Sequence, residues 1–157
     1  MKIIKKLWNN SPHVVYNSLL QRISPSRASP SWTKVKAGPL EGGSLYIDSS
    51  SYLGWQEMVQ GNFDTFIYDN LGSVDGLVFW DIGAHFGYHS LAFASLVGDR
   101  GHVYSFAPNP FNEVRLKMNV DRNKALTNII TVLPLALSNA DGEVEFVFSD
   151  DVDDSSS

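Results

Sequence analysis

A short loop that begins with a carboxylate is the part of this sequence best suited to bind a ligand. Residues 81–90 are Asp-Ile-Gly-Ala-His-Phe-Gly-Tyr-His-Ser. Gly83 allows the backbone to turn sharply and approach a ligand, and Gly87 allows the following helix to pack close to the preceding strand. The spacing D-x-G-x-x-x-G differs from G-x-G-x-x-G, the pattern that places a pyrophosphate at a helix N-terminus.

The carboxylate of Asp81 indicates which kind of ligand the loop favours. A negative charge at the end of a strand repels a pyrophosphate but attracts a ligand that carries an ammonium group and a sulfonium. S-adenosylmethionine has both groups. A tight turn that binds no ligand is the alternative interpretation of the same residues, and the spacing disfavours a nicotinamide-dependent oxidoreductase.

Two histidines in or beside this loop could act as metal ligands or as a base. His85 and His89 are four residues apart, but a turn separates them and no third ligand is evident, so we expect no metal site. His89 could accept a proton during catalysis, although a histidine that packs on a helix surface is the more frequent case. The catalytic residues are therefore unknown at this stage. Because the sequence has no cysteine, disulfides, thiolate metal sites and cysteine nucleophiles are excluded.

Alternating strands and helices predict the fold that would position the loop. The expected elements are strands at residues 77–80, 102–106 and 129–133, a helix at about 88–97, and a helix that starts at Pro110 after the N-cap Asn109 and carries Phe111, Val114 and Met118 on one face. The continuous apolar run at 77–80 is typical of a central strand covered on both faces. Such alternation requires right-handed crossovers, and ligands then bind beyond the carboxyl ends of the strands. The sequence therefore predicts an α/β fold with a doubly wound, mostly parallel sheet.

The rest of the chain carries weaker signals. We expect a helix at 11–22, a Ser- and Pro-rich linker at 23–32, a strand at 44–48, a helix near 61–71 and a last strand at 143–148. The length of 157 residues allows one domain. We divide it into a basic N-terminal extension and linker (1–40), the N-terminal portion of a ligand-binding domain (41–150) and a disordered acidic and Ser-rich tail (151–157).

The net charge of −5 is unevenly distributed. Residues 1–40 hold seven of the twelve Lys and Arg residues and no acid, so the remaining five basic residues face all seventeen acids. A basic arm could contact an anionic membrane or a nucleic acid, but a solvated extension is the favoured interpretation and we expect no nucleic-acid partner. No apolar run is long enough to predict a transmembrane segment, and we expect a cytoplasmic protein.

Several motifs in order resemble those of the FkbM methyltransferase family. They are Gly61-Asn62-Phe63-Asp64, Val78 to Ala84, Gly87-Tyr88, Val103 to Phe106 with Pro108-Asn109-Pro110, Asn119, Leu133 to Ser138, and Asp141 to Val144. The resemblance extends from about residue 40 to residue 150. It implies a class I, Rossmann-like methyltransferase fold with S-adenosyl-L-methionine as the methyl donor. It also implies transfer to an oxygen of a small molecule, such as a sugar or a polyketide.

The resemblance further implies roles for individual residues. Asp81, Gly83, Ala84, His85 and Gly87 would surround the methionine part of the cofactor, with His85 standing where the family usually has asparagine. Asn109 would lie near the ribose. Ala136 and Leu137 would lie near the adenine. The identity of the methyl acceptor and the oligomeric state are not encoded in these motifs.

Two features depart from the family pattern. The family has an acid at the end of the second strand, where it accepts hydrogen bonds from both ribose hydroxyls, and Ala107 occupies that position here. The family also continues through further strands, so we expect this chain to be a truncated form or a fragment. Both departures favour the alternative hypothesis, a non-catalytic relic or an interaction module of the same fold.

Overall fold

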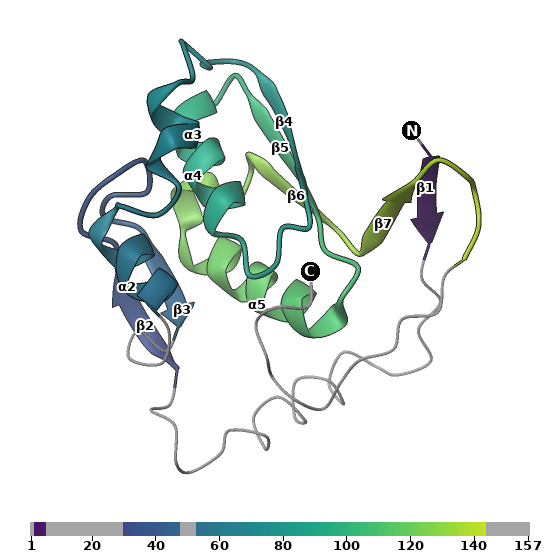
Figure 1. Ribbon diagram of the computed structural model, residues 1–157, viewed down its shortest axis with the longest axis horizontal. Helices are drawn as coiled ribbons and strands as arrows, with labels where there is room; N and C mark the ends of the chain where they lie inside the picture. Colours follow the sequence, from purple (N-terminus) through teal and green to yellow (C-terminus); the bar gives the residue numbers. More distant parts are fainter. Residues whose placement is uncertain (1, 6–29, 48–52, 144–157) are drawn as a thin grey trace.

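A parallel sheet of three strands lies at the centre of the protein (Figure 1). The structure is a computed structural model that describes residues 2–5, 30–47 and 53–143. The strands lie in the order β4 (Val78–Ile82), β5 (His102–Phe106) and β6 (Ile130–Leu133), and the crossovers are α4 (Tyr88–Val97) and α5 (Pro110–Arg122). This arrangement confirms the predicted α/β class with its parallel, Rossmann-like sheet.

The two crossover helices begin and end where their capping residues predict. The side chain of Asn109 accepts a hydrogen bond from the backbone N–H of Phe111 (2.9 Å), and Pro110 occupies the first turn. Gly98, with a φ of 64°, ends α4. The apolar face predicted for α5 is not its most buried side. Phe111, Val114 and Met118 are only half-buried, whereas the side that packs on the sheet and hairpin presents the fully or nearly fully buried residues Leu116, Asn119 and Val120.

Helices cover only one face of the sheet within the described residues. On the covered face, Phe79 of β4 stacks on Phe93 of α4 with a centroid separation of 4.3 Å. On the other face, Val78, Trp80 and Ile82 are 58%, 48% and 61% exposed. The prediction that β4 is covered on both faces is therefore wrong for this structure, because both α4 and α5 pack on the same side.

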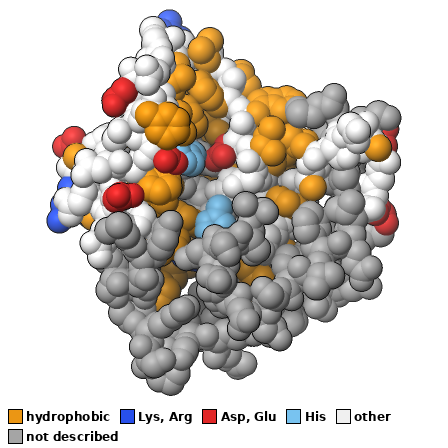
Figure 2. All heavy atoms as spheres, in the orientation of Figure 1, with side chains coloured by type: hydrophobic (Ala, Val, Ile, Leu, Met, Phe, Trp, Pro, Cys, Tyr) orange, Lys and Arg blue, Asp and Glu red, His pale blue; other side chains and the backbone are white. Residues whose placement is uncertain are grey.

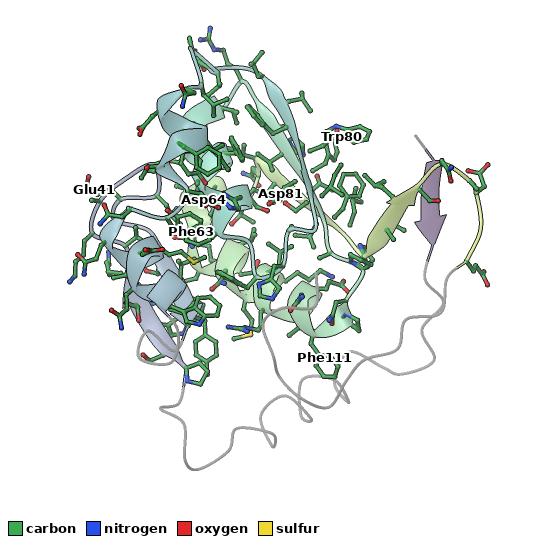
Figure 3. The ribbon with its side chains drawn as sticks, viewed as in Figure 1. Glu41, Phe63, Asp64, Trp80, Asp81 and Phe111 are labelled. Carbon is green, nitrogen blue, oxygen red and sulfur yellow. The ribbon has the colours of Figure 1, made fainter. Side chains whose placement is uncertain are left out.

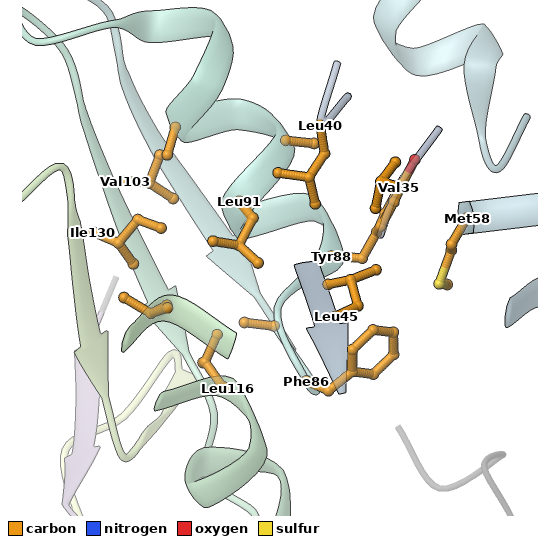
Figure 4. Packing of buried hydrophobic residues seen from close by; sticks show 14 of the residues in the cluster. Val35, Leu40, Leu45, Met58, Phe86, Tyr88, Leu91, Val103, Leu116 and Ile130 are labelled. Atoms are coloured by element: carbon orange, nitrogen blue, oxygen red, sulfur yellow. The ribbon is translucent and has the colours of Figure 1, made fainter. Parts of the chain in front are cut away.

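An antiparallel hairpin extends the core on the helix side. It consists of β2 (Ser31–Lys34) and β3 (Ser44–Ile47). Val35 and Leu40, from the connection between the two strands, are buried, and they pack in one cluster with Leu91 of α4 (Figure 4). The predicted linker was thus wrong at its end, and residues 31–40 lie inside the folded unit rather than in an extension. The composition of 23–32 did not indicate a strand at 31–34, because that strand is defined by its pairing with β3, which follows only after the connection.

Asn119 of α5 and Asn123, the C-cap residue of that helix, attach this hairpin to the rest of the domain. Asn119 is fully buried; its side chain accepts a hydrogen bond from the N–H of Tyr46 (2.8 Å) and donates one to the carbonyl of Phe86 (2.8 Å). One turn later, Asn123 accepts from the N–H of Ser44 (2.9 Å) and donates to its carbonyl (2.8 Å). These side chains join β3, α5 and the loop after β4 into one unit.

The remaining elements correct several expectations. The helix predicted near 61–71 is the shorter α3 (Thr65–Asp69), and it is preceded by α2 (Leu53–Gln60), which was not predicted. They are separated at Gly61, where a Cβ would come within 2.4 Å of the Ala37 backbone. The chain continues through η1 (Lys124–Leu126) to β7 (Leu135–Ser138), an unpredicted strand that pairs antiparallel with β1 (Lys2–Lys5).

Some predictions cannot be compared with the structure. The helix expected at 11–22 and the tail at 151–157 lie outside the described residues, as does nearly all of the strand expected at 143–148. In the part of the chain that is described, none of the helices combines the length and apolarity needed to cross a membrane.

Candidate functional site

The loop after β4 is anchored to the carboxyl end of the neighbouring strand. The backbone N–H groups of Gly83 and Ala84 both donate to the carbonyl of Phe106, at 3.1 and 3.0 Å. Phe106 is the last residue of β5, and Asn109 follows three residues later. The fold therefore brings the loops after β4 and β5 together at the edge of the sheet where parallel folds bind their ligands.

The two glycines of the loop have different roles. Gly83 has a φ of 84°, and a Cβ added there would meet no atom within 4 Å. Gly87 has a φ of 96°, but its Cβ would lie only 2.2 Å from a Leu116 side-chain carbon. Gly83 thus opens onto free space that a ligand could fill, whereas Gly87 allows α4 to pack against α5.

The residues between these glycines also differ in exposure. Ala84 is 6% exposed and belongs to the core. His85 is half-buried and has a φ of 49°, in the left-handed region. Asparagine and histidine are enriched among the non-glycine residues that adopt this conformation, which explains why histidine can stand where the family usually has asparagine.

Asp81 is held in a fixed orientation by two buried serines. Its carboxylate accepts a hydrogen bond from the hydroxyl of Ser90 in α4 (2.5 Å), and the hydroxyl of Ser105 in β5 donates to that of Ser90 (2.8 Å). Burial raises the pKa of Asp81 above its ordinary value, while the hydrogen bond from Ser90 and the proximity of His89 oppose that shift. The carboxylate therefore lies at the strand end with its geometry set by the fold.

The segment ahead of the sheet contributes a second carboxylate. Phe63 packs edge-on against Tyr88, with ring centroids 5.6 Å apart. Asp64, which has a φ of 50°, places its carboxylate 3.2 Å from Nε2 of His89. In Figure 3, Asp64 and Asp81 lie in the same region beside α4. The motif Gly61-Asn62-Phe63-Asp64 thus places the carboxylate of Asp64 beside the first turn of α4.

His89 is also bonded to a tyrosine, a contact that sequence analysis missed. The hydroxyl of Tyr68 lies 2.5 Å from Nδ1 of His89. Burial, followed by the neighbouring Tyr88, Asp81 and Asp64, raises the pKa of Tyr68 far above its ordinary value. Figure 2 shows acidic side chains on either side of a histidine in a hollow of this face. Asp64 and Tyr68 are 25 and 21 residues from His89, so no local spacing rule could have paired them.

Other predicted site residues have mainly structural contacts. The side chain of Asn109 caps α5, so its oxygen is already engaged. Ala136 and Leu137 lie in β7 and pair with Ile4 and Ile3 of β1, outside the three-stranded sheet. Their proximity to an adenine, like the contact of Asn109 with a ribose, stays a prediction. Among the described residues, no three His, Asp or Glu side chains gather in a way that could hold a metal ion.

Ala107 occupies an enclosed position. It is 2% exposed, belongs to the buried cluster, and donates its N–H to the carbonyl of Leu133 (2.9 Å). A longer side chain at this position would therefore enter the core. The position at which the family has an acid is therefore enclosed in this structure.

We expect Ala107→Glu to destabilise the protein. Burying a carboxylate without a charged partner is unfavourable, and we expect the free energy of unfolding in urea to fall by about 3 kcal/mol. Ala140→Glu is the matched control, because Ala140 is exposed and the same substitution should change little there. Equal stability of the two variants would contradict the enclosed position of Ala107.

The fold and the loop together define a Rossmann-like α/β domain with an acid-and-glycine loop at the end of its first parallel strand. Residues 81–157 match the family described as "Methyltransferase FkbM domain". The match begins at Asp81, the first residue of the loop, and covers just under half of the chain.

Comparison with solved structures gives a more distant similarity. A crystal structure of PH0793 from Pyrococcus horikoshii, provisionally described as a transferase, matches with 16% sequence identity and a TM-score of 0.46. The match covers 69% of this chain and 37% of that one, so this chain spans well under half the length of that protein. A comparison with curated proteins gives no significant match.

Proposed function

We propose that this chain is part of an S-adenosyl-L-methionine-dependent methyltransferase that methylates an oxygen of a small molecule or sugar. The observation that carries the proposal is the free space beside Gly83, two residues after the fixed carboxylate of Asp81. A backbone that approaches a ligand closely, beside a carboxylate that attracts an ammonium group, suits the methionine end of this cofactor.

The two ends of the candidate cofactor site fit the cofactor unequally. Asp81 and Gly83 supply the charge and the space that the methionine end needs. The ribose end lacks the usual acid, since Ala107 is buried and Asn109 caps a helix. When bound, the cofactor would supply an activated methyl group, and the residues of this chain would bind and orient it, because methyl transfer depends mainly on alignment.

Calorimetric titration of the chain with S-adenosylhomocysteine and, separately, with NAD tests the proposal. We expect the first ligand to bind and the second to give no heat of binding. The alternative, a non-catalytic relic or interaction module, is favoured by Ala107 and by the exposed apolar face of β4. Absence of binding by both ligands would reject the proposal in favour of that alternative, and binding of NAD alone would indicate an oxidoreductase.

We expect Asp81→Asn to weaken the binding of S-adenosylhomocysteine. The asparagine keeps the size of the side chain but removes the charge, and hydrogen bonds to charged groups contribute about 1.5–3 kcal/mol. The dissociation constant should therefore rise at least about tenfold. Asp75→Asn is the control, because Asp75 is exposed and pairs with Arg100. Equal affinities for both variants would remove Asp81 from the cofactor site.

The pH dependence of binding follows from the same residue. Because the pKa of Asp81 is raised by burial, the carboxylate takes up a proton as the pH falls through that raised value. We expect the affinity for S-adenosylhomocysteine to be full above the raised pKa and to decrease as the pH falls through it. Calorimetry over a pH series measures this, and Asp81→Asn should flatten the curve.

A further inference from the structure

Tyr68, His89 and Asp64 form a connected chain of polar contacts beside the loop. Tyr68 belongs to α3, His89 to the first turn of α4, and Asp64 directly precedes α3. The phenol oxygen lies 2.5 Å from Nδ1 of His89, and Nε2 lies 3.2 Å from the Asp64 carboxylate. With its proton on Nε2, the imidazole donates to Asp64 and accepts from Tyr68.

The geometry decides which of the three side chains, Tyr68, His89 or Asp64, can bind a ligand. Both ring nitrogens of His89 are engaged, so the imidazole has no nitrogen left for a second partner. The phenol oxygen of Tyr68 donates its proton to Nδ1 and still keeps lone pairs that can accept a hydrogen bond. The side chains of His89 and Asp64 are 28% and 36% exposed, so the chain of contacts is open to solvent.

Acidic and aromatic side chains surround Tyr68, His89 and Asp64. The titratable groups that face them are Asp81 from β4 and Tyr88 from α4. The ring of Phe63 lies 5.7 Å from that of His89, and the ring of Phe93 lies 5.6 Å from that of Tyr68. Because the pKa of Tyr68 is raised, the phenol keeps its own proton and can take another only as it passes that proton to His89.

We propose that Tyr68 is a catalytic residue that takes the proton from the hydroxyl group of the methyl acceptor, and that His89 and Asp64 are positioning residues. This inference rests on the proposed function. The hydroxyl oxygen bonds to the methyl carbon while the carbon–sulfur bond breaks, and the electron pair of that bond remains on sulfur. The hydroxyl proton passes to Tyr68, the phenol proton passes to Nδ1 of His89, and Asp64 stabilises the imidazolium.

The same arrangement restricts the class of acceptor. Asp64 and Asp81 both place negative charge near the phenol of Tyr68. This charge repels an acceptor that arrives as an anion, whereas a phenolate formed in the site is balanced by the imidazolium of His89. The acceptor is therefore an alcohol or phenol without a negative charge.

The first test is a spectroscopic one on the full chain without any ligand. Long-range ¹H–¹⁵N spectra of the histidine rings should show His89 with its proton on Nε2. Tyr68→Phe should shift the Nδ1 resonance of His89 and leave His102 unchanged, since His102 bonds to Thr131 on the other face of the sheet. A proton on Nδ1, or a His89 signal that Tyr68→Phe does not move, would overturn the inference.

The second test uses 4-nitrophenol, whose absorption reports its ionisation, with the chain saturated by S-adenosylhomocysteine. We expect a saturable increase in phenolate absorption, which Tyr68→Phe abolishes without changing the affinity for S-adenosylhomocysteine. Tyr104→Phe is the control, because this half-buried tyrosine packs against His102 and Trp80 away from the site. His89→Gln should lose the signal, and His102→Gln should keep it.

The two proposals fail in different ways. If S-adenosylhomocysteine does not bind, the proposed function fails. If it binds and the 4-nitrophenol signal is absent, or is equal in Tyr68→Phe, only the role of Tyr68 fails.

Discussion

Gly83→Val is expected to abolish binding of S-adenosylhomocysteine while the circular dichroism spectrum stays nearly unchanged. The φ of 84° at Gly83 disfavours a β-branched residue, and the added side chain would occupy the free space that the ligand needs. We expect a loss of affinity of at least about 100-fold, equivalent to about 2.7 kcal/mol. Calorimetry at matched protein concentrations measures it.

The chain offers a matched control for the backbone strain itself. Gly42 has a φ of 79°, and a Cβ there also meets nothing within 4 Å, but it lies in the connection between β2 and β3. Gly42→Val should therefore show a similar loss of stability with unchanged affinity. If Gly83→Val binds as well as Gly42→Val does, the loop after β4 is not the cofactor site.

Asn119→Leu is expected to cause a large loss of stability. The substitution preserves the number of heavy atoms in the side chain but leaves the N–H of Tyr46 and the carbonyl of Phe86 without their partners. Each unsatisfied buried group costs about 1–3 kcal/mol, so we expect a decrease of about 4 kcal/mol in the free energy of unfolding. Urea denaturation followed by tryptophan fluorescence measures this change.

Asn112→Leu provides the comparison within the same helix. Asn112 is half-buried, and we expect its replacement to change the free energy of unfolding by less than about 0.5 kcal/mol. A similarly small effect of Asn119→Leu would show that the hairpin is held mainly by apolar packing. Because Phe86 lies in the loop after β4, Asn119→Leu should also weaken S-adenosylhomocysteine binding in whatever fraction remains folded.

The crossover helices and their strands could be predicted because their signals are local. Asn109, Pro110 and Gly98 mark helix ends through contacts within a few residues, so α4 and β5 have the bounds that the sequence predicts. The buried side of α5 could not be predicted this way. A polar residue, Asn119, lies at the centre of that side. Its side chain can be buried there because it forms hydrogen bonds with backbone groups of β3 and of the loop after β4.

The hairpin of β2 and β3 is a second feature that local sequence signals could not predict. The Ser- and Pro-rich composition before Ser31 predicts a linker, and only the pairing with Ser44–Ile47 reveals a strand. Val35 and Leu40 are buried in one cluster with Leu91 of α4, which is distant in the sequence. Composition describes a segment, whereas its burial depends on the segments that fold against it.

For this protein, the sequence by itself determined the α/β class, the position of the loop at Asp81 to Gly87 and the resemblance to the FkbM methyltransferase family, because backbone geometry and motif spacing are properties of neighbouring residues. Only the tertiary structure decided that Gly83 opens onto free space while Gly87 packs on Leu116. It also decided that Ala107 is enclosed and that His89 joins Tyr68 to Asp64. These features are contacts between distant segments, and such contacts exist only after the chain has folded.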